Sequence, residues 1–179
     1  MQQYLGRSFS ERLRADDEEQ LESVVFTATV QQRLLRQLEL KGRWQGGVLF
    51  GEETLGTLTV RFVAPLGPPA WSTQPLFPHL QYLIGWSDSI SEQYGSALDW
   101  CGNWIAAPDS RLPDERLELN WLHLGAQQGL FDDTHPLVVL GLEDGRLSGR
   151  VYAWAEDGPL VLGGPLEVPS PAQDRGDTA

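Results

Sequence analysis

The chain has little of what disulfide-bonded, membrane-spanning and secreted proteins need. Its 179 residues include one cysteine, Cys101, and one lysine, Lys41. A single cysteine excludes a disulfide within the chain. No apolar run approaches the roughly 18 residues of a membrane-spanning helix, and the segment Met1–Gln20 is polar and acidic, unlike a secretory signal peptide. We therefore expect a cytoplasmic protein that does not associate with membranes.

Positive charge is also scarce. Lys and Arg together number 13 against 25 Asp and Glu, which gives a formal net charge of −12. Nonspecific binding to nucleic acid or to an anionic membrane depends on clustered Lys and Arg. The scattered basic residues therefore argue against direct nucleic-acid binding by a basic patch. The acidity has two interpretations, solubility or attraction to a basic partner, the second including mimicry of nucleic acid.

The composition changes twice along the chain. Residues 1–22 are dominated by charged side chains and predict an acidic, flexible N-terminal arm. Residues 23–162 carry the apolar patterns of one folded domain. Residues 163–179 are rich in Pro, Asp, Gly and Ala, which predicts a disordered tail.

The first half of the domain predicts three strands and a helix. Ser23–Thr29 is rich in β-branched residues and predicts a strand. From Val30 onward, apolar residues recur four apart, which predicts a helix that ends near Gly42. Gln45–Phe50 and Thr57–Val63 predict two further strands.

The second half alternates helices and strands. The proline-rich segment Leu66–Pro78 predicts an irregular loop. It is followed by a predicted helix, Leu83–Tyr94, and a buried strand, Leu98–Ile105. After a polar loop, Asp114 is a candidate N-cap for a helix with the apolar face Leu117, Trp121 and Leu124.

A hairpin closes the predicted domain. Its strands are Pro136–Leu142 and Leu147–Trp154, and Asp144-Gly145 forms the turn. The resulting order of strands and helices predicts an α/β fold, with a mixed β-sheet and helices packed on it.

Two short motifs resemble those of the JAB/MPN family, the JAMM metalloproteases. Gly46–Gly51 is similar to the small-residue motif that ends an early strand in the family. Gly102-Asn103-Trp104 and Pro108 match the frame of the family's Gly-x-Trp-His-x-His-Pro motif, and Leu112-Pro113 then precedes a helix as it does there. The resemblance covers residues 24–154. It implies a JAB/MPN-like (cytidine-deaminase-like) architecture. Family members cut isopeptide bonds next to ubiquitin-like proteins or trim small substrates.

The residues that bind and use zinc in the family are missing from this chain. The resemblance places the two histidines at Ile105 and Ala107. It places the glutamate that takes a proton from zinc-bound water at Trp44, or at Arg43 if the alignment shifts by one residue. These side chains provide no zinc ligand at the histidine positions, and the family mechanism requires both imidazoles.

The serine and aspartate of the family do not restore the site. They fall on Asp114 and Leu117 when the alignment is anchored on Pro113, and on Glu115 and Glu118 when it is counted from the lost second histidine. One carboxylate cannot hold zinc with useful affinity. We therefore expect no metal, no cofactor and no hydrolysis by the family mechanism.

We use the name vestigial pocket for the residues that the resemblance places at or next to the family's zinc site. Replacing a polar zinc cleft with hydrocarbon leaves two alternatives, a filled site or a dry pocket that binds a ligand. The vestigial pocket consists of Trp44, Trp104, Ile105, Ala107, Asp114, Glu115 and Glu118.

We interpret the chain as a catalytically inactive JAB/MPN-like domain that acts through protein–protein interaction. The resemblance implies a scaffold or regulatory role beside an active peptidase or a ubiquitin-like protein, as a homodimer or a heterodimer. In the proline-rich loop, Trp71 and Phe77 are candidate partner-binding side chains.

Two alternatives remain open from the residues. One is a hydrolase with a remodelled, non-zinc site that uses Cys101 or the acids of Asp109–Glu118. Cys101 has no basic neighbour in the sequence and lies in a predicted buried strand, which favours a structural role. The other is an acidic inhibitor or mimic that binds a basic protein surface. The three histidines, His79, His123 and His135, lack metal-ligand spacing, which favours surface or capping roles.

Overall fold

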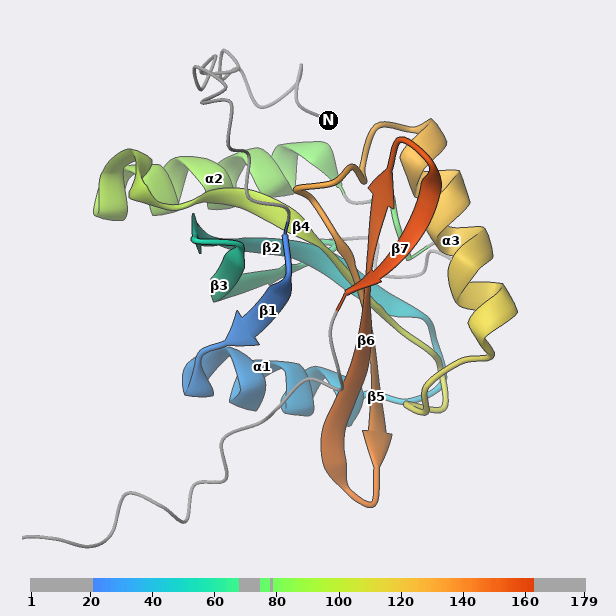
Figure 1. Cartoon of the computed structure of the whole chain (residues 1–179). Helices are drawn as coiled ribbons and strands as arrows, with labels where there is room; N and C mark the ends of the chain where they lie inside the picture. The colour runs from blue at the N-terminus through green and yellow to red at the C-terminus, as the bar shows by residue number, and fades with distance from the viewer. Residues whose placement is uncertain (1–20, 68–74, 78, 163–179) are drawn as a thin grey trace, which may run out of the picture.

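The strands of the protein form one curled, mixed sheet. The computed structural model describes residues 21–67, 75–77 and 79–162. Within them the sheet has seven strands in the order β1-β3-β2-β4-β5-β6-β7 (Figure 1). The β1–β3 and β4–β5 pairs are parallel and the other neighbours are antiparallel. The predicted α/β class with a mixed sheet is confirmed.

The described helices and strands alternate along the chain in nearly the predicted order. They are β1 Ser23–Phe26, α1 Ala28–Leu38, β2 Gln45–Thr54, β3 Thr57–Pro65, α2 Leu80–Tyr94, a short 3-10 helix Gly95–Ala97, β4 Asp99–Ala106, α3 Glu115–Gln127, β5 Leu137–Glu143, β6 Arg146–Ala155 and β7 Gly158–Leu162.

The helices cover the sheet from both faces. The buried face of α1 packs in one apolar cluster with alternate residues of the strands, Trp104 among them. The opposite face carries two clusters, one beneath α3 that includes Ile105 and one beneath α2 that includes Val48. Because side chains alternate along a strand, neighbours such as Trp104 and Ile105 belong to different layers. Figure 1 shows α1 on one side of the sheet, with α2 and α3 on the other.

Two hairpin turns use the backbone conformation that tight turns require. At the predicted Asp144-Gly145 turn, φ is 51° and 75°, so both residues lie in the left-handed region and the prediction is confirmed. Leu55 and Gly56 adopt the same conformation between β2 and β3, with φ of 51° and 69°.

The predicted boundaries differ from the structure at both ends of the domain. β1 ends at Phe26, because Thr27 is already the N-cap of α1. Leu21, which falls in the predicted arm, is buried against the α1 side of the sheet. β7 was not predicted, although it begins at Gly158 of an Asp157-Gly158 pair that resembles the turn sequence Asp144-Gly145.

The predicted apolar face of α3 is wrong by one residue. Its fully enclosed side is formed by Glu118, Leu122 and Gly125, whereas Leu117 is 38% exposed. Trp121 is only partly buried. The sequence pattern failed here because a glutamate occupies a core position.

None of the described helices is long and apolar enough to cross a membrane.

Candidate functional site

The residues of the vestigial pocket are organised by the antiparallel pair β2–β4. In this pair Gln45 lies opposite Ala106 and Gly46 lies opposite Ile105. Trp44 immediately precedes the first strand and Ala107 immediately follows the second. The positions that the resemblance assigns to the catalytic glutamate and the histidines therefore lie at one end of two adjacent strands.

Hydrocarbon fills the space around Ile105. Its side chain is 0% exposed and packs in a cluster with Leu122 of α3 and with Leu76, which are also 0% exposed. A Cβ atom on Gly46 would lie 2.4 Å from the carbonyl oxygen of Pro75, so the segment before α2 approaches the strand closely. These contacts favour the filled site over the dry pocket.

Trp104 lies on the other face of the sheet. It is 1% exposed and packs with the cluster beneath α1. Its Nε1 has no hydrogen-bond partner. A Cβ atom on Gly47 would lie 2.8 Å from this Nε1, so the neighbouring strand has room for the indole only because residue 47 is a glycine. Trp104 therefore supports the core and does not line the same space as Ile105.

Trp44 and Trp121 form an aromatic pair at the edge of the vestigial pocket. Their ring centroids are 5.7 Å apart and the ring planes meet at 67°, an edge-to-face contact that stabilises both rings. Both side chains are partly buried. The Nε1 atom of Trp121 is buried and has no hydrogen-bond partner.

The three acidic residues of the vestigial pocket have separate roles. Asp114 caps α3, accepting a hydrogen bond from the backbone N–H of Arg116 at 2.8 Å, as predicted. Glu115 is exposed in the first turn of the helix. Glu118, one turn further along, is 0% exposed.

Glu118 is held by two side chains of β6. Arg150 donates from Nε to Oε2 at 2.8 Å and from a terminal guanidinium nitrogen to Oε1 at 2.5 Å. The hydroxyl of Tyr152 donates to Oε2. Arg150 also donates to the carbonyl oxygen of Pro113 at 2.8 Å, which ties β6 to the segment before α3.

The contacts with Glu118 shift the pKa values of Arg150 and Tyr152. The hydrogen bonds to Glu118 raise the pKa of the Arg150 guanidinium further above its ordinary value, outweighing partial burial. Burial, and then the hydrogen bond to Glu118, raise the pKa of the Tyr152 hydroxyl. We therefore expect the guanidinium to stay charged and the phenol to stay neutral at physiological pH.

Glu118 does not lie next to Ile105, because the strand that binds Glu118 is two strands away from β4. Arg150 lies opposite Val139 of β5, and Val139 lies opposite Ile105 of β4. Two strand spacings of about 4.8 Å separate β4 from β6. Among the residues that the structure describes, no three His, Cys, Asp or Glu side chains are grouped so that they could hold a metal ion.

The candidate partner loop is described only in part. Phe77 is 40% exposed, and its neighbour Leu76 is buried beneath α3. Trp71 lies outside the described residues.

Cys101 lies in the core beneath α1. It is 7% exposed, as the sequence predicts. Burial, with a smaller contribution from Asp99, raises the pKa of its thiol far above the ordinary value. A nucleophilic cysteine needs a stabilised thiolate, so this setting favours a structural thiol.

The sequence did not predict a cluster of interacting side chains around His135. Its Nδ1 lies 2.8 Å from Oδ1 of Asp132, and its ring stacks on Trp100 with centroids 4.3 Å apart. Asp132 also accepts hydrogen bonds from the backbone N–H groups of Thr134 and His135, at 2.9 and 2.7 Å. The short Asp-x-Thr-His spacing is a signal for such a capped turn, but the contact with Trp100 depends on the fold.

The other histidines hold surface positions, as predicted. His79 caps α2, accepting a hydrogen bond at Nδ1 from the backbone N–H of Tyr82 at 3.2 Å. His123 is exposed on α3 and lies 2.9 Å from Gln127.

No protein-family model matches the chain, and no curated protein sequence matches it either. Its fold is similar to the solution structure of protein DSY2949 from Desulfitobacterium hafniense, with a TM-score of 0.55 and 16% sequence identity. The similarity covers 80% of this chain and 95% of that one. At this identity, the likeness establishes a shared fold alone.

Proposed function

We propose that the protein is a catalytically inactive JAB/MPN-like domain that acts through protein–protein interaction. The observation that carries the proposal is the pairing of β2 with β4, which brings Trp44 to the same end of the sheet as Ile105 and Ala107. Zinc hydrolases need nitrogen or oxygen ligands and an open coordination position. Here Ile105 is enclosed by other apolar side chains.

The state of Glu118 supports the same proposal. Under the more favourable alignment it would replace the metal-binding aspartate, yet both of its oxygens are engaged by Arg150 and Tyr152. A guanidinium within the chain supplies the positive charge that this carboxylate needs. The role of Glu118 is then structural.

The remodelled-hydrolase alternative receives less support. Its first candidate nucleophile, Cys101, is buried and its thiol pKa is raised. We predict that Cys101→Ser has no effect on any activity of the protein. It should lower the free energy of unfolding only slightly, on the order of 1 kcal/mol, because it places a hydroxyl in an apolar core. Loss of a hydrolytic activity in this variant would favour the enzyme.

The interaction function is tested by co-purification from the source cells followed by mass spectrometry. We expect a partner that stays bound to the wild type and is lost from Phe77→Ser, because exposed aromatic side chains often anchor interfaces. Tyr94→Ser is the matched control, since Tyr94 is similarly exposed, at 48% against 40% for Phe77, but lies at the far end of α2.

The salt dependence of the capture tests the second alternative, an acidic inhibitor or mimic. An acidic mimic would release its partner as ionic strength rises, whereas an apolar interface would retain it. Retention of the partner by Phe77→Ser, with loss in the Tyr94→Ser control, would contradict the assignment of the partner loop.

A further inference from the structure

A small apolar patch lies on the sheet beyond α3, and we call it the β7 patch. It consists of Trp154 of β6, Pro159 and Val161 of β7, and His123 of α3. Pro159 lies directly opposite Trp154. The ring of His123 is 5.5 Å from that of Trp154. Val161 is 54% exposed, more than any other large hydrophobic residue within a described strand.

β7 is also an edge strand of the described sheet. Exposed edges of natural sheets are commonly protected by charged side chains, but the five residues of β7, Gly158–Leu162, include none. Pro159 removes one backbone N–H from the strand and limits pairing at that position. The edge near Val161 keeps its backbone groups, so an extended segment could lie along it.

Acidic side chains surround the β7 patch. Glu156 and Asp157 form the exposed turn that leads into β7. On the other side of β6, the backbone N–H of Trp154 donates to the carbonyl oxygen of Asp132 at 3.1 Å, so the backbone of Asp132 and of the exposed Asp133 runs next to that strand. Burial alone would raise the pKa of Asp132. The contact with His135 and the hydrogen bonds from the backbone N–H and hydroxyl of Thr134 outweigh it and lower the pKa to about 2, so this carboxylate stays charged.

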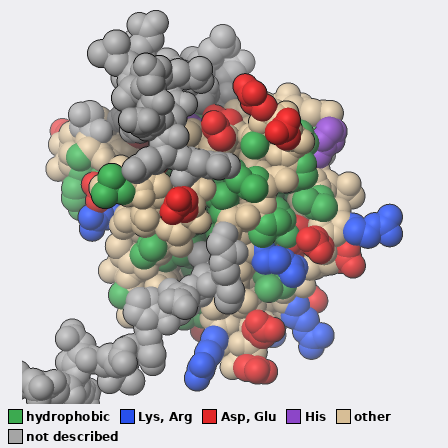
Figure 2. Space-filling model, in the orientation of Figure 1, with side chains coloured by type: hydrophobic (Ala, Val, Ile, Leu, Met, Phe, Trp, Pro, Cys, Tyr) green, Lys and Arg blue, Asp and Glu red, His purple; other side chains and the backbone are tan. Residues whose placement is uncertain are grey.

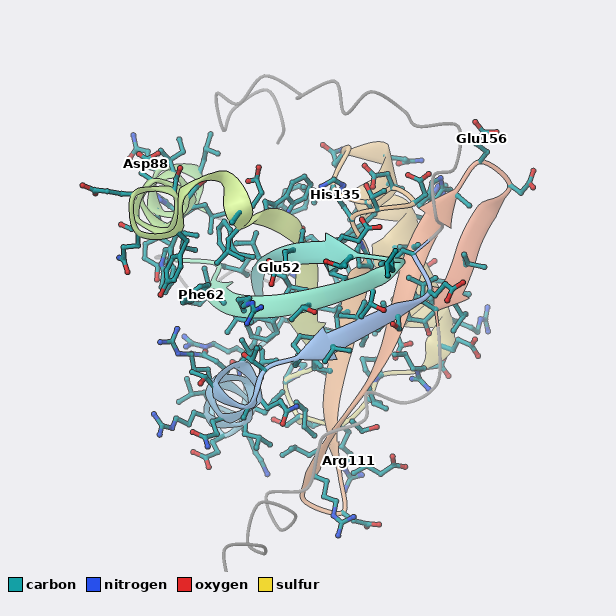
Figure 3. The ribbon with its side chains drawn as sticks, turned by 60° about the vertical axis from the view of Figure 1, so that its left-hand side comes forward. Glu52, Phe62, Asp88, Arg111, His135 and Glu156 are labelled. Carbon is teal, nitrogen blue, oxygen red and sulfur yellow. The ribbon has the colours of Figure 1, made fainter. Side chains whose placement is uncertain are left out.

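Among the described residues, one basic side chain, Arg150, lies close to the β7 patch. Within the described residues, neither 117–145 nor 151–162 contains a Lys or an Arg. Arg150, on the same face of β6, is paired with Glu118. Figure 2 shows hydrophobic side chains over the β7 region, with Asp and Glu along their upper border and Lys or Arg directly below them. In Figure 3, Glu156 lies at the end of the molecule opposite Arg111 and on the other side of the view from Asp88.

We propose that the β7 patch binds an extended segment of a partner protein that carries an aliphatic or aromatic residue flanked by Lys or Arg. The apolar residue would cover Val161 and Pro159, and the basic residues would lie near Glu156, Asp157 and Asp133. Charge complementarity selects this occupant over an acidic or neutral segment. The inference rests on the proposed interaction function and assigns it a second surface, distinct from Phe77.

The test is a titration of the ¹⁵N-labelled full chain with a capped octapeptide that alternates Lys or Arg with Val, Leu or Phe. The ionic strength is about 0.15 M, where the Debye length is about 8 Å. We expect saturable shifts confined to His123, residues 132–133 and residues 154–161. The double variant Glu156→Gln, Asp157→Asn should weaken the dissociation constant about fivefold or more, because it removes two carboxylates from the rim. Val161→Asp should weaken it further.

The matched control is Asp88→Asn, Glu92→Gln, which removes the same charge from α2. We expect this variant to change the affinity by less than about twofold, since surface charges beyond a Debye length are screened. Equal losses in both double variants, binding of the Asp/Glu counterpart peptide with equal affinity, or no saturable shift would each overturn the inference. Shifts centred on Trp44, Phe77 and Trp121 would overturn this surface while leaving the interaction function standing.

Discussion

At the scale of single residues, the clearest feature is a carboxylate in the core. Glu118 is fully enclosed, and its two oxygens accept hydrogen bonds from Arg150 and Tyr152. A buried charge without a partner is costly, and a paired one is tolerated only when its hydrogen bonds are satisfied. The cluster therefore fixes α3 against β6.

We predict that Arg150→Gln destabilises the protein by about 3–5 kcal/mol, because it leaves the Glu118 carboxylate buried without a countercharge. Tyr152→Phe should cost about 1.5–3 kcal/mol, the range for a hydrogen bond to a charged group. Urea unfolding measures both. Arg146→Gln, at an exposed position of the same strand, is the control and should change stability by less than about 0.5 kcal/mol. A loss below about 1 kcal/mol for Arg150→Gln would contradict this role.

A second prediction concerns pH. The pKa of Asp132 is lowered from 3.8 to about 2, so the folded protein holds this proton less tightly than the unfolded chain does. Its stabilising contribution is therefore complete above pH 4 or so and is lost as the pH falls toward 2. Asp132→Asn should lower the free energy of unfolding at pH 7, and the difference from wild type should shrink at pH 3. A difference that grows on acidification would contradict the assignment.

Residue identity predicted some of these roles and not others. Asp114 could be predicted as an N-cap because a cap depends only on its own helix. The core position of Glu118 could not, because its partner Arg150 lies 32 residues away in the sequence. The stacking of His135 on Trp100 was beyond prediction for the same reason, since the two meet only across β4 and the segment before β5.

At the scale of elements, the close approach of the segment before α2 to β2 depends on a glycine. A Cβ atom on Gly46 would lie 2.4 Å from the carbonyl oxygen of Pro75 and 2.9 Å from that of Trp104. Both contacts are with backbone, which cannot move as a side chain can. Leu76 then packs beside Ile105.

We predict that Gly46→Ala destabilises the protein by about 1–3 kcal/mol through overpacking and exposes the segment around Pro75 to proteases. Gly85→Ala is the control, because a Cβ atom there meets nothing within 4 Å, and alanine is the better helix former by about 1 kcal/mol. Chemical denaturation and limited proteolysis provide the measurements. Equal stability of the two variants would mean that residues 75–76 do not pack against β2 as described.

The elements themselves were largely predictable from periodicity and turn residues. The alternation of Thr57–Val63 and the Asp144-Gly145 turn gave correct strands and a correct hairpin. The face of α3 was predicted wrongly because Leu117, Trp121 and Leu124 form an apolar stripe at helical spacing. In the structure the neighbouring stripe, which contains Glu118, faces the sheet, and Glu118 is bound by Arg150 of β6. β7 was missed because it is short and half exposed, so it lacks the apolar run of a buried strand.

At the scale of the whole molecule, charge is separated in space. The basic residues described in the structure lie on α1 and the segment after it, on β3, near the start of α3 and on β6, while α2 and the β6–β7 turn carry only acidic charges. The net charge of −12 was predictable from composition, but the placement of Asp132, Asp133, Glu156 and Asp157 on two sides of β6 was not. This placement depends on the fold, which brings the segment before β5 and the β6–β7 turn to the same end of β6.

The central claim is that hydrocarbon occupies the positions where the JAB/MPN resemblance expects a metal site. The most direct test is elemental analysis of purified protein that has been exposed to excess zinc and then desalted. We predict well below about 0.1 equivalent of zinc per chain, because Ile105 and Ala107 offer no ligand. One tightly bound equivalent would contradict the account.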